Sequence, residues 1–317
     1  MEQDKRAAVL MKRYKTLQQH RNNWESHWQE IADYIVPRKA DITKQRHAGD
    51  KRFELIFDGT AIHAAELMAA SLHGMLTNAS TPWFSLRYPD RELENDDMAR
   101  EWLEGATDVM YTELHRSNFH EAIHELYSDL VTFGTAVMFI DTDKEQNLRF
   151  STRHIAECYV SEDEFGRVDT VYREFKMSAK AALDQFGEEN ISKRIAKKVQ
   201  QDPYEHITLL HVVMPRTERD SLKLDAKNKP FSSCYLDPEE KIILSESGFD
   251  EFPYVVPRYL KASFEHGYGR SPAMTALADT KMLNKMSETV IRAAQLQIHP
   301  PLLVPDDGFQ IRHKGQN

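Results

Sequence analysis

The chain has 317 residues, of which 41% are hydrophobic and 29% charged, a composition that excludes an intrinsically disordered protein. Its 41 Lys and Arg against 50 Asp and Glu give a net charge of −9, which argues against a protein that grips nucleic acid through a basic surface. The acidity is concentrated in residues 61–250, where 21 basic residues face 35 acidic ones, whereas both ends are mildly basic.

Cysteine usage and hydropathy indicate the compartment. Cys158 and Cys234 are too few for a disulfide scaffold and form no metal-binding spacing, so we expect reduced thiols and no metal. The first residues lack the apolar core of a signal peptide, and no run approaches the roughly 18 apolar residues that a membrane span needs. The sequence therefore predicts a soluble, intracellular protein without a membrane partner.

Residues 1–35 predict one long amphipathic helix that ends at Pro37. Packing of this helix on its own domain is the simpler interpretation. The alternative is packing against a neighbouring subunit, for which Trp24 and Trp28 are the candidates, because tryptophan is enriched at protein interfaces. The apolar stripe of the helix comprises Ala7, Leu10, Tyr14, Leu17, Arg21, Trp24, Trp28, Ile31 and Ile35.

More helices follow before the pattern changes. We expect a helix over 61–76, a short strand over 81–86, and helices over 95–116 and 118–133, with Gly134 as the C-terminal stop. The residues expected to be buried in the first two of these helices are Ala65, Met68, Ala69, Leu72, Met75, Met98, Trp102, Leu103, Ala106, Met110 and Leu114.

After Gly134 the hydrophobic period shortens toward two, which indicates a largely antiparallel β region. A helical insert opens at Ser178, breaks at Gly187 and resumes over 190–201. The fold class is therefore α+β, helical over 1–134 and mainly β with a helical insert over 135–265. The expected strands are 135–141, 148–151, 158–160, 168–175, 206–214, 231–236, 241–246 and 252–260.

The sequence predicts a long helix after the β region. Ser271 is its expected N-cap and Pro272 its first residue, and it runs to about Gln297, a length of roughly 39 Å. A strand-like segment, 302–304, follows the terminating prolines.

One motif in the sequence is typical of a zinc-dependent catalytic site. His120, Glu121 and His124 match H-E-x-x-H on a predicted helix, in which the two imidazoles would bind zinc and the carboxylate would act as general base. The downstream Gly and third His of the extended motif are missing, so a solvated helix face is the preferred interpretation and a zinc peptidase the alternative. No phosphate-binding loop, nucleophile elbow or dinucleotide fingerprint occurs, which favours a non-enzymatic protein without a cofactor.

A succession of short patterns resembles a known family. In order and spacing these patterns are similar to the portal, or head-to-tail connector, proteins of short-tailed bacteriophages, over about residues 10–300. The patterns are Tyr34-Ile35-Val36-Pro37, Phe57-Asp58-Gly59-Thr60-Ala61, Trp83-Phe84-Ser85-Leu86, Asn118-Phe119, Asp129-Leu130-Val131-Thr132-Phe133-Gly134-Thr135-Ala136, Pro257-Arg258-Tyr259, Tyr268-Gly269-Arg270-Ser271-Pro272, Leu277-Ala278-Asp279 and Leu283-Asn284.

The resemblance implies a virion protein that forms a twelve-fold ring at one capsid vertex, with host cytoplasm as the place of assembly. Double-stranded DNA would be pumped through the ring by a terminase and leave by the same route. Terminase, tail adaptors, capsid and scaffolding proteins would be partners. An alternative within phage biology is a head-assembly protein without a channel.

The resemblance also assigns the parts of the chain. Residues 1–265 would form the wing, 266–298 the first stem helix beside the channel, and 299–317 the start of a clip, after which the family's later elements are missing. Three cations of the stem helix, Lys281, Lys285 and Arg292, are then the candidates for facing DNA or the adjacent subunit.

Overall fold

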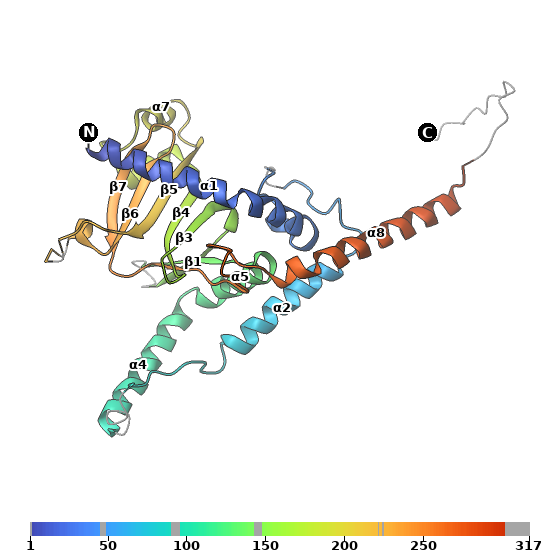
Figure 1. Ribbon diagram of the computed structural model, residues 1–317, viewed down its shortest axis with the longest axis horizontal. Helices are drawn as coiled ribbons and strands as arrows, with labels where there is room; N and C mark the ends of the chain where they lie inside the picture. Colours follow the sequence, from blue (N-terminus) through green and yellow to red (C-terminus); the bar gives the residue numbers. More distant parts are fainter. Residues whose placement is uncertain are drawn as a thin grey trace.

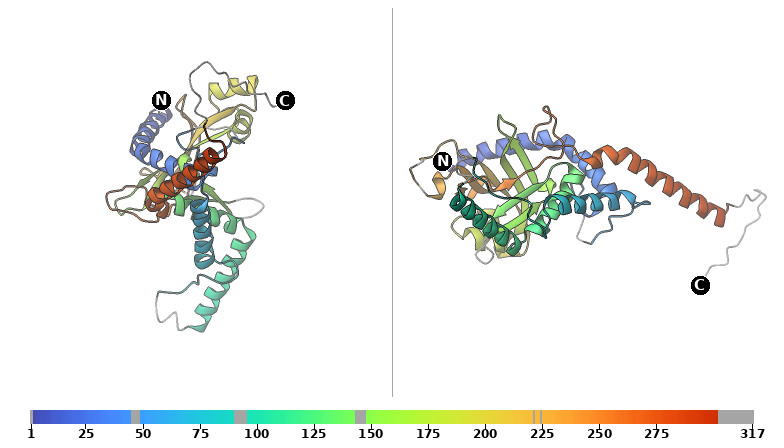
Figure 2. Two further views of the ribbon diagram at one scale, coloured as in Figure 1. Left: turned by 90° about the vertical axis from the view of Figure 1, so that its right-hand side faces the viewer. Right: turned by 90° about the horizontal axis from the view of Figure 1, so that it is seen from below.

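The structure is a computed structural model that describes residues 2–44, 49–89, 96–142, 148–220, 222–223 and 225–301. Within these ranges, two antiparallel sheets and several helices form a body from which α4 and α8 project (Figures 1 and 2). The chain is α+β, as the sequence predicts. None of the described helices is long and apolar enough to cross a membrane.

Helix α1, Glu2–Ile35, lies along one face of the larger sheet (Figure 1). A 3₁₀ turn at Pro37–Lys39 follows it, which confirms the predicted end of the helix. Trp28 is fully buried within its own chain, so it is not available to a neighbouring subunit, contrary to the second interpretation of the stripe. Trp24 is half-buried and packs against Trp28 and Tyr268.

The larger sheet has the strand order β3-β4-β5-β6-β7, and the smaller one β2-β1-β8, with every neighbouring pair antiparallel. The strand expected over 252–260 is reduced to two residues, because beyond them the chain makes only single bridges, Thr135 to Arg258 and Leu260 to Arg270. The strands are β1 Val137–Asp141, β2 Arg149–Arg153, β3 Cys158–Glu162, β4 Val168–Ser178, β5 His206–Pro215, β6 Phe231–Asp237, β7 Ile242–Phe249 and β8 Tyr254–Val255.

Both faces of the larger sheet are covered. Successive residues of a strand point to opposite faces, so Leu210 of β5 packs beneath α1, whereas Leu209 faces the helical insert. The insert consists of α6, Ala179–Phe186, and α7, Lys193–Gln201. The two-sided cover explains why β5 reads as a nearly continuous apolar run.

Three helices extend the other end of the body: α2 Thr60–Leu76, α4 Asp97–Arg116 and α5 Phe119–Phe133. Helix α5 is largely buried, but α2 buries only Ala69 and α4 buries only Thr107 among their side chains. The expected core along 61–76 and 95–116 is therefore confirmed in part: Ala69 is buried, and Ala65, Met68, Leu72, Leu103, Ala106 and Leu114 are half-buried. It is wrong for Met75, Met98, Trp102 and Met110, which are exposed. Residues 81–86 form no strand, since they lie along α4 rather than beside a sheet.

Helix α8, Pro272–Ile298, begins at the body and extends away from it (Figure 1). Its start agrees with the sequence: Ser271 caps it and Pro272 is its first residue. Of its apolar side chains only Ala273 and Leu277 are buried, and those after Asn284 are exposed. The predicted strand at 302–304 lies outside the described residues.

Candidate functional site at the base of helix α8

The end of α5 meets the start of α8 at a backbone contact. Gly134 ends α5 in the left-handed conformation, with φ of 75°, which a glycine adopts without strain. The amide of Tyr259 donates to the carbonyl of Gly134 at 2.9 Å, and a methyl group on Gly134 would stand 2.6 Å from the carbonyl carbon of Arg270. The close approach therefore requires glycine at this position.

Side-chain hydrogen bonds fix the direction in which α8 leaves. The Ser271 hydroxyl donates to the carbonyl of Thr132 at 2.7 Å and accepts from the amide of Met274 at 3.0 Å. The amide of Gly269 donates to the Thr135 hydroxyl at 2.8 Å. Because these groups are buried, each bond removes a polar group that would otherwise be unsatisfied.

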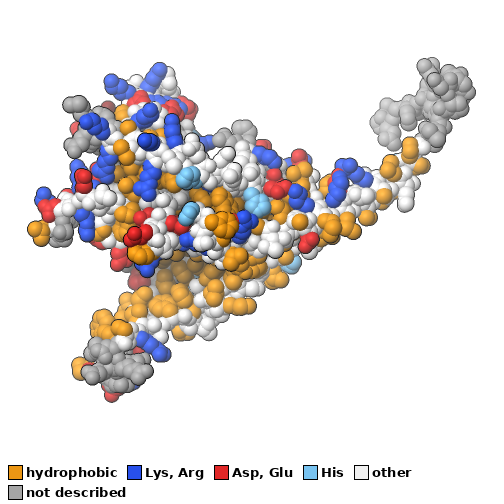
Figure 3. Space-filling model, in the orientation of Figure 1, with side chains coloured by type: hydrophobic (Ala, Val, Ile, Leu, Met, Phe, Trp, Pro, Cys, Tyr) orange, Lys and Arg blue, Asp and Glu red, His pale blue; other side chains and the backbone are white. Residues whose placement is uncertain are grey.

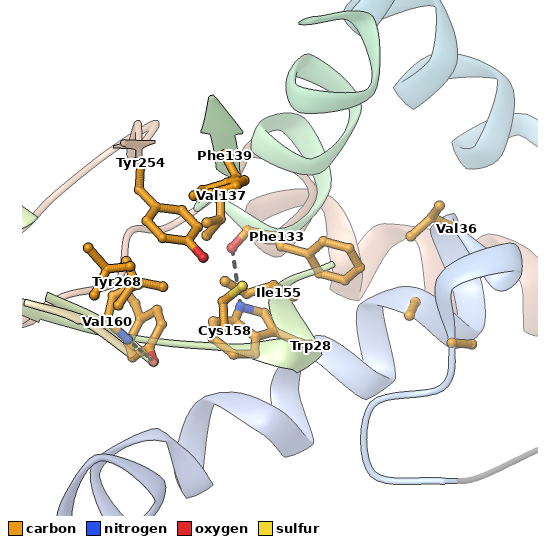
Figure 4. Close-up of a cluster of buried hydrophobic side chains, with 14 residues drawn as sticks. Trp28, Val36, Phe133, Val137, Phe139, Ile155, Cys158, Val160, Tyr254 and Tyr268 are labelled. Carbon is orange, nitrogen blue, oxygen red and sulfur yellow. Dashed lines mark hydrogen bonds between the residues drawn. The ribbon is translucent and has the colours of Figure 1, made fainter. Parts of the chain in front are cut away.

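Aromatic side chains from distant segments fill the space behind this junction (Figure 4). The Trp28 indole donates to the carbonyl of Phe133 at 3.2 Å, and its ring centroid lies 5.1 Å from that of Tyr268. The Tyr268 hydroxyl accepts from the amide of Val160 at 3.3 Å. One cluster thus connects α1, α5, β3 and the segment that precedes α8.

A second anchor lies three turns further along α8. The buried Asn284 amide donates to the carbonyl of Leu55 at 2.8 Å and accepts from the amides of Phe57 at 2.7 Å and Asp58 at 3.2 Å. The Asp58 side chain in turn accepts from the amide of Thr60, where α2 begins. The base of α8 and the start of α2 are therefore held together.

Two cations, the buried Arg21 and the half-buried Lys39, connect α1 and the turn after it to neighbouring elements. The guanidinium of Arg21 donates to the carbonyls of Ile155, Ala156 and Cys158 at 2.8 to 3.0 Å, which explains a charged residue within the apolar stripe. The ammonium of Lys39 lies 2.5 Å from the fully buried carboxylate of Asp129. Burial raises the pKa of Asp129, and the neighbouring Lys39 acts in the opposite direction.

The geometry brings together most of the short patterns on which the family resemblance depends. Ile35, the Phe133-Gly134-Thr135 step, Tyr259, the Gly269-to-Pro272 turn and Asn284 all lie within the network that carries α8. Their shared role is to fix the position and direction of one projecting helix. No catalytic side chain is needed for that role.

The three predicted stem cations occupy one side of α8, at spacings of four and seven residues. The Lys281 ammonium pairs with Glu30 of α1 and lies 5.8 Å from the ring of Tyr34, so it is directed at its own chain. Lys285 and Arg292 are exposed and share the carboxylate of Glu288 at 2.9 and 2.5 Å. This pairing lowers the pKa of Glu288.

The H-E-x-x-H residues lie in a group of histidines that the sequence does not reveal. The ring of His73, from α2, lies 5.7 Å from those of both His120 and His124, and His115 of α4 lies 5.2 Å from His120. Burial, with smaller contributions from neighbouring imidazoles, lowers the pKa values of His73 and His120. Nothing in the local sequence pairs His73 with residues about 50 positions later.

The donor geometry does not support the zinc peptidase alternative. Across the part of the chain that the structure describes, no three His, Cys, Asp or Glu side chains are arranged to hold a metal ion. His120 and His124 instead contribute to the contact between α2 and α5. Cys158 and Cys234 are buried free thiols, as predicted, and burial raises their pKa values to about 12 and about 11.

Comparison with known proteins agrees with this arrangement. Residues 7–317 match the family described as bacteriophage head to tail connecting protein. The chain belongs to that family. It is 32% identical over 301 residues to the probable portal protein of Bordetella phage BPP-1, and 31% identical over 301 residues to the portal protein of Salmonella phage epsilon15. These alignments cover 94% and 93% of this chain but 54% of each relative, so the chain spans about half the length of the curated relatives it matches.

Proposed function

We propose that this chain is part of a phage portal subunit, twelve copies of which form a ring at one capsid vertex. The ring would serve as the conduit for DNA packaging and ejection and as the platform that joins head to tail. The observation that carries the proposal is the network at the base of α8, which uses distant family motifs to fix a single projecting helix. The role is structural, without chemistry on a substrate.

The proposal divides the chain by function. Residues 1–265 would form the wing, 266–298 the first stem helix, and 299–317 would enter the clip. The virion would be its location, after assembly in the host cytoplasm. A terminase, tail adaptors, and capsid and scaffolding proteins would be the partners. The excess of acidic over basic residues in 61–250 suits a wing that does not retain DNA, because carboxylates and phosphates are both negatively charged and repel each other.

Electron microscopy or native mass spectrometry of the full-length protein tests the proposal. A closed ring with a central channel is expected. A persistent monomer would contradict the portal function, and a closed shell or filament without a channel would favour the alternative of a head-assembly protein.

Lys285 and Arg292 are the stem cations that we propose face translocating DNA or the adjacent subunit, with Lys281 orienting the helix through Glu30. Replacing all three with Gln should reduce ring formation or the amount of packaged DNA. A control with the same change in charge replaces Lys180, Lys193 and Lys197, which are exposed on the two helices of the insert. The idea fails if ring assembly and packaging are both unchanged in the stem variant, or equally reduced in the control.

A further inference from the structure

Helices α4 and α8 project from the body, and large apolar side chains along both are exposed (Figure 2). Hydrophobic side chains gather over α2 and α4 on one side of the molecule (Figure 3). Exposed apolar patches of this kind mark interaction surfaces.

The outer face of α4 carries a regular apolar stripe. Met98, Trp102 and Val109 are 81%, 66% and 63% exposed, and Gly105 lies between them. Their spacing of four, three and four residues places them along one line of the helix. The opposite face of α4 is occupied by residues 83–86, which bond to the hydroxyls of Thr107 and Tyr111.

Among the residues that the structure describes, none requires a glycine at position 105. A Cβ added there would meet no atom within 4 Å, and glycine in a helix interior costs about 1 kcal/mol relative to alanine. A glycine in the middle of an exposed apolar stripe allows another chain to approach the helix backbone closely.

Helix α2 carries a second exposed stripe with the same spacing. His63, Leu67, Ala70 and Gly74 are all exposed, and a Cβ on Gly74 would also meet nothing within 4 Å. Among its 17 residues, Glu66 is the only one with a formal charge, although a helix exposed to water normally carries a charged face. The composition of α2 therefore fits a helix that another protein surface covers in the oligomer.

The two stripes are complementary in one orientation. An antiparallel alignment pairs Met98 with Gly74, Trp102 with Ala70 and Gly105 with Leu67, so in these three pairs a large side chain meets a small one. The fourth pair in this register is Val109 with His63. A parallel alignment pairs Trp102 with Leu67 and Gly105 with Ala70, which opposes large to large and small to small. Within one chain every residue of both stripes is exposed, so these stripes do not cover each other.

We propose that the outer stripe of α4 in one copy packs antiparallel on the stripe of α2 in the next copy. This inference rests on the proposed ring, in which each subunit must present two unlike surfaces to its two neighbours. A head-to-tail contact between different helices meets that requirement, whereas α4 pairing with α4 would close a dimer. Trp102 is the central anchor, opposite the small side chain of Ala70.

Cysteine cross-linking of the full-length protein tests the register. Oxidation of the double variant Val109→Cys with His63→Cys should give a ladder of linked subunits, and each single variant should stay unlinked. The control, Val109→Cys with Gly74→Cys, places the thiols about 16 Å apart in this register and should link at least fivefold less. The natural thiols at Cys158 and Cys234 are buried, so they give no background.

Each outcome has a distinct meaning. Rings that form while the two double variants link equally would overturn the inference and leave the portal function in place. Dimers from Val109→Cys alone would show α4 pairing with itself and also overturn it. Absence of any ring in the unsubstituted protein would contradict the proposed function instead. Trp102→Glu, at an exposed position that should not affect folding, is expected to reduce ring formation at least tenfold, and unchanged assembly would oppose the inference.

Discussion

The backbone of Gly134, at the end of α5, lies directly against the backbone of Gly269, at the start of α8, and neither residue has room for a side chain. A Cβ on Gly269 would stand 2.9 Å from both the Gly134 carbonyl oxygen and the Cβ of Arg258. The direction of the projecting helix therefore depends on two glycines that are 135 positions apart in the sequence.

Replacing Gly134 with Ala should lower the free energy of unfolding by more than about 2 kcal/mol, because it adds both a steric clash and a left-handed backbone strain. Denaturant unfolding followed by circular dichroism measures the change. Gly105→Ala is the matched control: its Cβ enters open space in a helix, so it should stabilise the isolated chain by about 0.5–1 kcal/mol. Similar losses at both sites would contradict the role of the Gly134 contact.

Arg21→Met should lower the free energy of unfolding by about 3 kcal/mol, since it leaves three carbonyl oxygens without a donor, two of them in buried hydrogen bonds. Arg21→Lys should recover only part of this loss, because an ammonium group lacks the planar fork that reaches all three oxygens. The midpoint of urea unfolding gives both values. Arg100→Met removes an exposed arginine that pairs with Asp97 and should change stability by no more than about 0.5 kcal/mol.

Acid should destabilise the fold through His211. Burial, reinforced by Arg173 and Arg153, lowers the pKa of this imidazole to about 3. Between about pH 6.5 and pH 3 the unfolded chain binds a proton that the folded chain does not, so the free energy of unfolding falls as pH falls, by up to about 1.4 kcal/mol per pH unit. The lowered pKa values of His73 and His120 act in the same direction.

His211→Gln should reduce that pH dependence. Its cost at pH 8 reports only the lost contacts of the neutral imidazole, which are the hydrogen bonds with Ser233 and Tyr254 and the ring contacts with Tyr235 and Phe139, because the imidazole is neutral there in both states. The difference between the cost of the substitution at pH 8 and at pH 5 then gives the contribution of the proton that only the unfolded chain binds. Urea unfolding at both pH values measures it, and an unaltered difference in the variant would show that His211 is not the responsible group.

Asn284→Ala should release the segment that precedes α2. The amides of Phe57 and Asp58 lose their acceptor, and their hydrogen exchange should become at least tenfold faster, while α8 itself remains helical. Hydrogen exchange with mass spectrometry resolves the segment. Gln295→Ala, on an exposed part of the same helix, should leave exchange at 57–58 unchanged.

Local sequence signals predicted most of the elements. The stripe of α1, the stop at Pro37, the glycine that ends α5 and the Ser271-Pro272 start of α8 were all recognisable, because each depends on residues within a few positions of one another. The extended segment over 81–86 was not distinguishable from a strand, since its apolar alternation does not reveal that its partner is a helix.

Hydrophobic periodicity predicted apolar faces on the helices over 61–76 and 95–116, but not what covers them. Periodicity is a property of one helix, whereas burial depends on a second surface, and none of the residues that the structure describes covers Met98 or Trp102. For the same reason Trp28 could not be assigned to core or interface before its neighbours Phe133 and Tyr268 were known.

The sequence by itself determined the α+β class, the order of the elements and the family resemblance, because these follow from short-range spacing and from the order of motifs. Only the tertiary structure decided that Gly134, Gly269 and Asn284 serve one junction, that Arg21 bonds three carbonyls, and that His73 joins His120 and His124. Contacts between residues distant in the sequence depend on how whole helices and strands pack together. That packing must fill the interior of the entire chain, so no short stretch of sequence specifies it.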